Sequence, residues 1–353
     1  MVLVFSFLLF LGCIIGQVLD TALIKGLLSF ITSVCLSFIM MEVGIEFSKE
    51  SKSFRSYGGD LLFASVAALL PALLWIGYFV LVMKDQLKPA IVMGISSAPT
   101  SAGVLFVMLM AAGLGSTWVF KKARVLAVLD DLVTILILTP LEILIHGFRW
   151  SSFATILLIM AFIFLSFRFK NAIPWPVSQR WLIIYSLTLT VLVSMFKYKT
   201  NIHLEVLIPA FMMGCLLKPL KEDAQQMSFS LANLIRGMFM LLVGATFPKI
   251  NMGSMTWTLA LTHVVLLTIL ANVGKSFLVF CYTREATFNE RMALSVAMFP
   301  RGEVGAAVLL IGLGYGFSGN ISTLAFLSLS LNLLMTSIFI WIVIKLLKHS
   351  SKR

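Results

Sequence analysis

Charged residues are scarce in this sequence. They make up 12% of the 353 residues, whereas about 25% is usual for a soluble domain. Apolar residues make up 60%, and apolar runs fill the chain from one end to the other. This composition excludes an ordinary soluble protein and is typical of membrane proteins. Because no soluble domain fits before, between or after the runs, we expect residues 1–353 to form a single transmembrane domain in a lipid bilayer.

Cysteine and catalytic motifs are scarce as well. The four cysteines lie inside apolar segments with no CxxC spacing, which predicts buried thiols instead of disulfides or metal ligands. No P-loop, HExxH or Ser/His/Asp arrangement appears, so we expect neither an enzyme nor a cofactor. The net charge of +12 does not predict a nucleic-acid partner, because Lys and Arg lie in short loops between apolar runs.

Twelve segments are apolar enough for membrane helices, which need about 20 residues each. The first has no basic region or cleavage site of a signal peptide, so we expect it to be retained. The sixth, seventh and eighth are short or weakly bounded. The segments are 3–19, 24–46, 61–83, 89–112, 125–145, 152–167, 181–196, 204–217, 230–247, 256–281, 292–314 and 322–346.

Basic residues alternate between the loops of these segments. If both termini are cytoplasmic, seventeen Lys and Arg residues lie on the cytoplasmic side and seven on the other. This bias follows the positive-inside rule. It predicts a multi-pass protein of a bacterial inner membrane with cytoplasmic N- and C-termini.

The twelve segments divide into two halves, approximately 1–168 and 181–346. The fourth and eleventh segments each contain a proline among small residues at mid-span, in 96–103 (SSAPTSAG) and 300–305 (PRGEVG). The two segments enter the membrane from opposite sides. Interrupted helices at matching places in two halves predict an inverted-repeat transporter with its site near the midplane.

Several charged residues lie inside the predicted spans, where each costs about 3 kcal/mol on insertion scales. With a rise of about 1.5 Å per residue, Asp131, Lys275, Arg301 and Glu303 lie about 13–18 Å from the cytoplasmic ends of their spans. Thr100 lies about 18 Å from the opposite face. Because the hydrocarbon core is about 30 Å thick, all five converge near one plane. This convergence predicts a functional site.

Asp130 and Asp131 are adjacent, so on a helix they point about 100° apart and cannot share one partner equally. We predict that Lys275 pairs with Asp130, which leaves a spare acid for a cation or a proton. Two readings without function stay open. Each acid could be neutralised by a base with no role in transport, and Lys275 could extend to the membrane interface.

Polar residues of the interrupted segments complete the candidate site. Thr100, Ser97 and Ser101 offer hydroxyls and freed carbonyls to a cation, or else fill a close helix contact. We expect Arg301 and Glu303 to be supports that close the freed backbone and neutralise charge, not ligands.

Three charged residues lie nearer the cytoplasmic ends of their spans. Glu42 and Glu46 end the second span near the cytoplasm, where a solvated entrance is one of two open interpretations. We expect Arg236 to extend towards the cytoplasmic surface.

These segments resemble the monovalent cation/proton antiporters, the sodium/hydrogen exchanger superfamily, in its bacterial Asp-Asp type. The resemblance rests on Leu129–Asp131, on SAPTS at 97–101, on PRGEV at 300–304 and on Gly44–Glu46, and it covers nearly the whole chain. It implies a core bundle in which the discontinuous fourth and eleventh helices cross. It also implies a separate panel that forms a homodimer, and an elevator mechanism. The chain shows no extra N-terminal helix of the kind many bacterial relatives have, which leaves the dimer interface open.

The resemblance also implies roles. Asp131 would bind Na⁺ and H⁺ in alternation, and Asp130 would pair with Lys275. The expected activity is secondary antiport of Na⁺, or of Li⁺ or K⁺, against H⁺ by alternating access. The alternative is a sodium-coupled symporter of an organic anion on a related inverted-repeat fold, although no set of residues for an organic substrate is evident. A channel needs a pore-lining ring or filter, and none is visible.

Overall fold

The computed structural model describes residues 2–18, 25–50, 58–101, 105, 109, 112–146, 175–200, 206–217, 229–246 and 255–350. Regular structure within these ranges is helical, which confirms the all-α class. The sixth predicted span, 152–167, lies outside the described residues.

Five helices pack mainly against one another, and we call them the panel helices. α1 packs closely on α10, and α2 packs on α9, with α8 and α10 also against α2. Glycine permits both close crossings, because a Cβ on Gly12 would overlap the backbone of Leu241 and a Cβ on Gly44 would overlap that of Phe211. The panel helices are α1 (Val2–Val18), α2 (Lys25–Glu50), α8 (Gln179–Thr200), α9 (Leu207–Leu216) and α10 (Phe229–Thr246).

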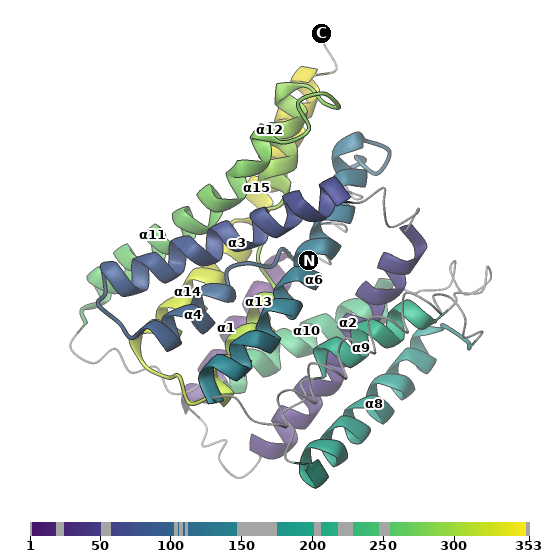
Figure 1. The fold of residues 1–353 in the computed structure, drawn as a ribbon, viewed down its shortest axis with the longest axis vertical. Helices are drawn as coiled ribbons and strands as arrows, with labels where there is room; N and C mark the ends of the chain where they lie inside the picture. Colours follow the sequence, from purple (N-terminus) through teal and green to yellow (C-terminus); the bar gives the residue numbers. More distant parts are fainter. Residues whose placement is uncertain are drawn as a thin grey trace.

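The remaining helices form a second group, which we call the core helices (Figure 1). α3 packs on α4, α6 and α11, while α14 packs on α11 and α15 packs on α12. The core helices are α3 (Gly58–Leu81), α4 (Leu87–Ile95), α6 (Trp118–His146), α11 (Trp257–Lys275) with a 3₁₀ helix at Ser276–Phe280, α12 (Phe288–Ala297), α13 (Glu303–Gly314), α14 (Asn320–Leu334) and α15 (Thr336–Ser350).

Two predicted spans contain non-helical segments. α4 ends at Ile95, and α12 ends at Ala297 before α13 begins at Glu303. Pro99 and Pro300 explain both endings, because proline lacks an N–H and disfavours helix at the residue before it. The N–H of Ser101 donates to the carbonyl of Pro300 over 2.9 Å, so the two non-helical segments lie against each other.

The twelfth predicted span, 322–346, is not the single helix that its apolar pattern predicts. α14 and α15 are separated at Met335 and bent by 44°. The two helices pack against different neighbours, α14 against α11 and α15 against α12. A continuous apolar run carries no signal of this change of partner.

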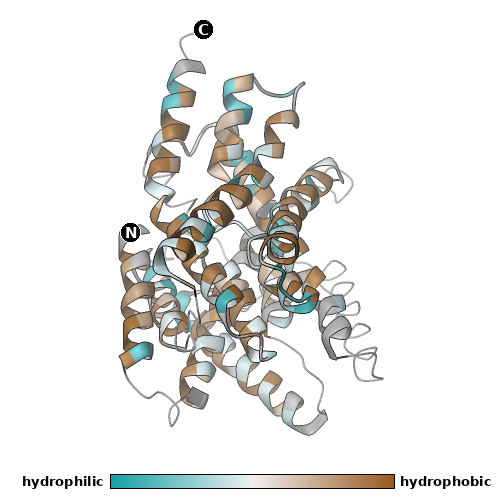
Figure 2. Cartoon of the chain, turned by 90° about the vertical axis from the view of Figure 1, so that its left-hand side faces the viewer, coloured by the Kyte–Doolittle hydropathy of each residue, from teal (hydrophilic) through white to brown (hydrophobic). Residues whose placement is uncertain are grey.

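Three described helices are long and apolar enough to cross a membrane, namely Gly58–Leu81, Gln179–Phe196 and Trp257–Phe280, and the bent α14–α15 pair makes a fourth. Apolar residues cover much of the helix surface (Figure 2). Four further apolar helices of the described part of the chain are shorter, namely Phe7–Val18, Gly26–Glu42, Leu231–Thr246 and Val304–Gly314. The count of twelve spans therefore stays a prediction.

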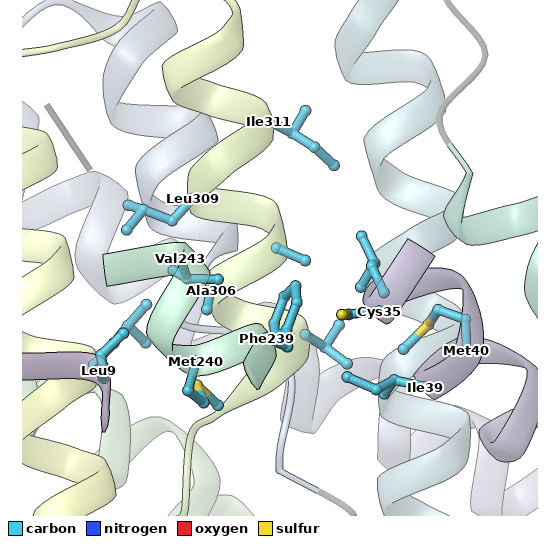
Figure 3. Packing of buried hydrophobic residues seen from close by; sticks show 14 of the residues in the cluster. Leu9, Cys35, Ile39, Met40, Phe239, Met240, Val243, Ala306, Leu309 and Ile311 are labelled. Atoms are coloured by element: carbon cyan, nitrogen blue, oxygen red, sulfur yellow. The ribbon is translucent and has the colours of Figure 1, made fainter. Parts of the chain in front are cut away.

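The panel and core helices meet through buried apolar side chains. Small and medium-sized residues of α13 gather with side chains of α1, α2 and α10 (Figure 3). The set includes Leu9, Cys35, Ile39, Phe239, Met240, Val243, Ala306, Leu309 and Ile311. The contact between the two groups is thus apolar at this level.

Candidate functional site

Four charged side chains are buried together within the core helices. Asp130 and Asp131 come from α6, Lys275 ends α11, and Arg301 lies between α12 and α13. Their exposed fractions are 0%, 0%, 0% and 1%. Two acids and two bases give zero net formal charge, which offsets part of the large cost of removing each ion from water.

Asp130 is held from two other segments. Lys275 Nζ lies 2.5 Å from its Oδ2. The backbone N–H and the hydroxyl of Thr100 donate to the same oxygen over 3.0 and 2.8 Å. Charge-assisted bonds of this kind are among the stronger hydrogen bonds in proteins. They balance the charge of Asp130 and join α6 to the end of α11 and to the segment after α4.

Lys275 does not extend to a membrane interface, because its side chain is fully buried against Asp130. It is the last residue of α11, where backbone carbonyls lack intrahelical donors and a cation is favourable. The hydroxyl of Ser295 donates to the carbonyl of Lys275 over 3.3 Å, which ties this end of α11 to α12.

Asp131 differs from Asp130 although the two are neighbours. The bonds from Thr100 and Lys275 go to Asp130. Asp131 is fully buried, and its charge acts on Lys275 through space. The two acids are therefore not equivalent, as the sequence predicts from their different directions on the helix.

The guanidinium of Arg301 donates hydrogen bonds to backbone carbonyls near the ends of three helices. Its Nε donates to the carbonyl of Ser97 over 2.7 Å, and its Nη2 donates to that of Ala271 over 2.9 Å. Its Nη1 donates to the carbonyls of Met298, over 3.2 Å, and of Phe299. These carbonyls lie just past the ends of α4 and α12 and near the end of α11, where the helix dipole is negative.

Arg301 therefore contacts backbone carbonyls of three segments, and its role as a support stays a prediction. Its expected partner Glu303 is the first residue of α13, and the side chain of Glu303 lies outside the described ones. A pair between the two stays a prediction.

Ser97 and Ser101 lie on either side of Thr100, and the hydroxyl of Ser97 binds its own backbone. The hydroxyl of Ser97 donates to the carbonyl of Gly94 over 2.7 Å. A Cβ on Gly302 would lie 2.5 Å from Ser101 Oγ, so a side chain larger than hydrogen does not fit where the two segments cross. Lone pairs of the Ser97 and Ser101 hydroxyls stay the predicted ligands of a cation.

Glu42 and Arg236 correct two interpretations of the sequence. Glu42 is buried instead of lining a solvated entrance, and Arg236 Nη2 lies 2.9 Å from Glu42 Oε2 instead of reaching the surface. The reason is that α2 packs on α10, which buries Glu42 and leaves the Arg236 side chain 17% exposed. The sequence carries the charges but not this pairing, because the residues are 194 positions apart.

A second charge cluster lies where α3 and α6 begin. Lys122 Nζ lies 3.0 Å from Asp60 Oδ1 and 3.2 Å from Glu285 Oε2. The phenol of Tyr282 donates to Asp60 over 2.5 Å, and the Lys122 ammonium lies 4.5 Å from the centre of its ring. Burial and the nearby acids raise the pKa of Tyr282 well above its ordinary value, so its phenol stays a donor. These residues flank the apolar runs, so the sequence carries no signal that singles out the cluster.

A tightly bound resident metal has no obvious site in the described part of the chain. No group of three or more His, Cys, Asp or Glu residues there could hold one. A transported cation is a different case, because hard cations bind carboxylate, hydroxyl and carbonyl oxygens. Asp131 and the hydroxyls of the interrupted segment are groups of these types.

Comparisons with known proteins identify the family and the fold of the chain. The family model of the sodium/hydrogen exchanger, transmembrane, matches residues 2–347. No curated protein matches the sequence. Among solved structures, the sodium proton antiporter MjNhaP1 from Methanocaldococcus jannaschii, determined at pH 8, is similar with a TM-score of 0.69. The two chains are 15% identical, and the match covers 97% of this chain and 92% of that chain, which shows a shared fold.

The family match includes every residue of the buried cluster and nearly all of the described helices. Members of this family are multi-pass membrane transporters and not enzymes, and they exchange cations for protons. The chain belongs to the sodium/hydrogen exchanger family.

Proposed function

We propose that this cation/proton antiporter exchanges Na⁺ for H⁺ at Asp131, by alternating access. The observation that supports Asp131 as the exchange site is the set of bonds that the neighbouring Asp130 accepts. Asp130 already accepts bonds from Lys275 and from two groups of Thr100, so its charge is balanced within the protein. Asp131 is the second acid of the same buried cluster.

Competition at one carboxylate explains exchange. One Na⁺ or one H⁺ at Asp131 changes the charge of the cluster by the same amount, and the two ligands use the same oxygens. Binding of one therefore requires loss of the other. The protein then moves either ligand across the membrane, but not both together at this carboxylate.

The helix ends around the cluster favour a cation. The C-termini of α4, α11 and α12 point into this region, and each carries roughly half a negative charge. Lys275 and Arg301 offset part of this potential. The remaining negative potential supports binding of a positive ion at Asp131 over an organic anion.

Burial of the cluster supports alternating access. Neither aspartate reaches solvent, so an ion must wait for a rearrangement before it binds or leaves. The apolar contact between panel and core helices is a surface along which two rigid groups can move (Figure 3). We propose that the core helices move against the panel, as in an elevator. A homodimer in the inner membrane, with both termini cytoplasmic, is part of the same proposal.

Proteoliposomes that contain a pH-sensitive dye test this function. Na⁺, Li⁺ and K⁺ are added separately, with the membrane potential clamped. We expect Na⁺ to trigger proton movement that survives the clamp. Absence of proton movement with all three cations, in protein that is monodisperse and correctly inserted, would contradict the proposal. A response only when an organic anion is added would favour the symporter.

A further inference from the structure

Side-chain hydrogen bonds join α11 to α14 at two levels. At the first, the Ser328 hydroxyl donates to the carbonyl of Val264 over 3.4 Å, and the Thr268 hydroxyl reaches the carbonyl of Ser328 over 3.5 Å. At the second, the amide nitrogen of Asn332 donates to the amide oxygen of Asn272 over 2.9 Å. The levels are four residues, about one turn, apart on each helix, so they follow one line of contact.

The second level lies beside the buried charges. Asn272 precedes Lys275 by three residues, which places both on one side of the last turn of α11. The carbonyl of Ala271, in the same turn, accepts from Arg301 Nη2. After Lys275 the chain continues as a 3₁₀ helix. The turn that carries Lys275 is therefore held by α14 through an amide and by the interrupted segment through Arg301.

Asn332 also lies near the point where α14 stops following α11. Its carbonyl accepts from the hydroxyl of Thr336, the first residue of α15, over 3.4 Å. α14 ends at Leu334, and the chain then bends. The hydrogen bond between the Asn332 and Asn272 amides thus joins the two helices close to the point where they separate.

The amide pair is poorly suited to packing alone. Asn332 is 1% exposed, and its Oδ1 accepts no hydrogen bond within the described ranges. A buried acceptor without a donor is unfavourable, and two apolar side chains of similar shape often pack as well or better. An amide pair also adds a directional contact. Its hydrogen bond fixes the rotation of one helix about its axis and its translation along that axis relative to the other helix.

We propose that the Asn272–Asn332 pair is a positioning element for Lys275, which sets the last turn of α11 so that the ammonium meets Asp130. Neither amide touches the transported ion, and both act through Lys275. The charged groups that face Lys275 are Asp130 and Asp131 of α6 and Arg301 of the interrupted segment. The inference rests on the proposed function, because its effect appears in exchange at Asp131.

The test uses the full chain in proteoliposomes with a pH-sensitive dye and Na⁺. Asn332→Leu removes the hydrogen bond between the two side-chain amides and replaces Asn332 with an apolar side chain of similar size. We expect normal yield and thermal stability, with the pH midpoint of exchange shifted by about half a unit or more. Asn272→Leu should give a similar shift, and the double variant should shift little further, because the two residues form one contact.

Ser328→Ala is the matched control. It removes the hydrogen bond from the Ser328 hydroxyl to the carbonyl of Val264 and should leave the pH midpoint of exchange unchanged. Should Asn332→Leu fail to fold, Asn332→Ala replaces it with the same expected shift. A wild-type midpoint in the Asn332 variants, or an equal shift in Ser328→Ala, overturns the positioning role. A loss of stability and rate with no change in midpoint also overturns it. If the wild-type protein exchanges no cation, the proposed function fails instead.

Discussion

Two charge clusters in this molecule contain the same kinds of side chain at different exposures. The buried cluster joins Asp130, Asp131, Lys275 and Arg301, and its side chains are at most 1% exposed. The second cluster joins α3, α6 and the segment before α12, and its side chains are partly exposed, at 12% for Asp60, 21% for Lys122 and 52% for Glu285. Both are arranged around a lysine–aspartate pair of hydrogen-bonding geometry.

Solvent makes the difference between them. Water and salt screen the second cluster, so a partner can be lost at small cost, and such pairs contribute about 0–1 kcal/mol. The buried cluster has no such compensation, and removal of one charge leaves its partner uncompensated. The lack of screening by water also makes the buried cluster sensitive to ion binding, because an entering ion changes its net charge. We therefore propose transport for the buried cluster and local anchoring for the partly exposed one.

The largest expected effect is that of Asp131→Asn. An amide can neither release a proton nor offer a full negative charge to Na⁺, so we expect exchange to fall to background. Proton movement in dye-loaded proteoliposomes measures it. Asp60→Asn is the control acid from the second cluster and should retain exchange. Full residual activity of Asp131→Asn would remove Asp131 as the site.

Arg301→Ala should have the largest effect on folding. It removes the hydrogen bonds that Arg301 donates to the carbonyls of Ser97, Ala271, Met298 and Phe299. Each buried carbonyl left without another donor costs about 1–3 kcal/mol. We expect low yield and a lower unfolding temperature, measured by thermal unfolding of the purified protein. Arg301→Lys should recover only part of the stability, since lysine is a point charge without the planar fork of donors. Wild-type stability of Arg301→Ala would show that other groups donate hydrogen bonds to these carbonyls.

Lys275→Ala should preserve some exchange but alter its pH dependence. The substitution leaves Asp130 without its cation, so Asp130 and Asp131 then compete for protons as a coupled pair. The pH profile and the charge moved per cycle are the measurements. Lys122→Ala is the matched control from the second cluster, and its profile should follow the wild type. An unchanged profile and unchanged charge movement in Lys275→Ala would contradict a role for the Asp130–Lys275 pair.

The smallest expected effect is that of Tyr282→Phe. Loss of the bond to Asp60 should destabilise the protein by about 1 kcal/mol, with exchange unchanged. Because the folded protein raises the pKa of Tyr282, this contribution is fully present below the ordinary tyrosine value of about 10 and is lost only as pH rises beyond it. Unfolding experiments between about pH 6 and 9 should therefore show a constant difference from wild type. A difference that disappears within that window would contradict the assignment.

Much of the buried cluster could be predicted because its residues violate a local rule. Lysine, arginine and aspartate inside apolar runs are costly, so each stands out in the sequence. Pro99 and Pro300 likewise predict the helix ends near them. The bond from Thr100 to Asp130 and the carbonyls bound by Arg301 could not be predicted, because they depend on which backbone segments cross.

Other features left no local signal. Glu42 and Arg236 are charges near the ends of their predicted spans, and only the packing of α2 on α10 makes them a partly buried ion pair. The bend at Met335 falls inside an unbroken apolar run, where periodicity predicts one helix. Asn272 and Asn332 are ordinary polar residues in sequence, and their importance follows from the contact between α11 and α14.

By itself, the sequence determined the membrane class, the positions of most helices and the identity of the buried charges. It did so because hydrophobic transfer and the cost of burying charge act residue by residue along the chain. Tertiary structure alone decided how Thr100 and Arg301 are used, and which helices stay in contact at the bend. Those outcomes depend on distances between groups up to two hundred residues apart, and such distances exist only once the helices have packed.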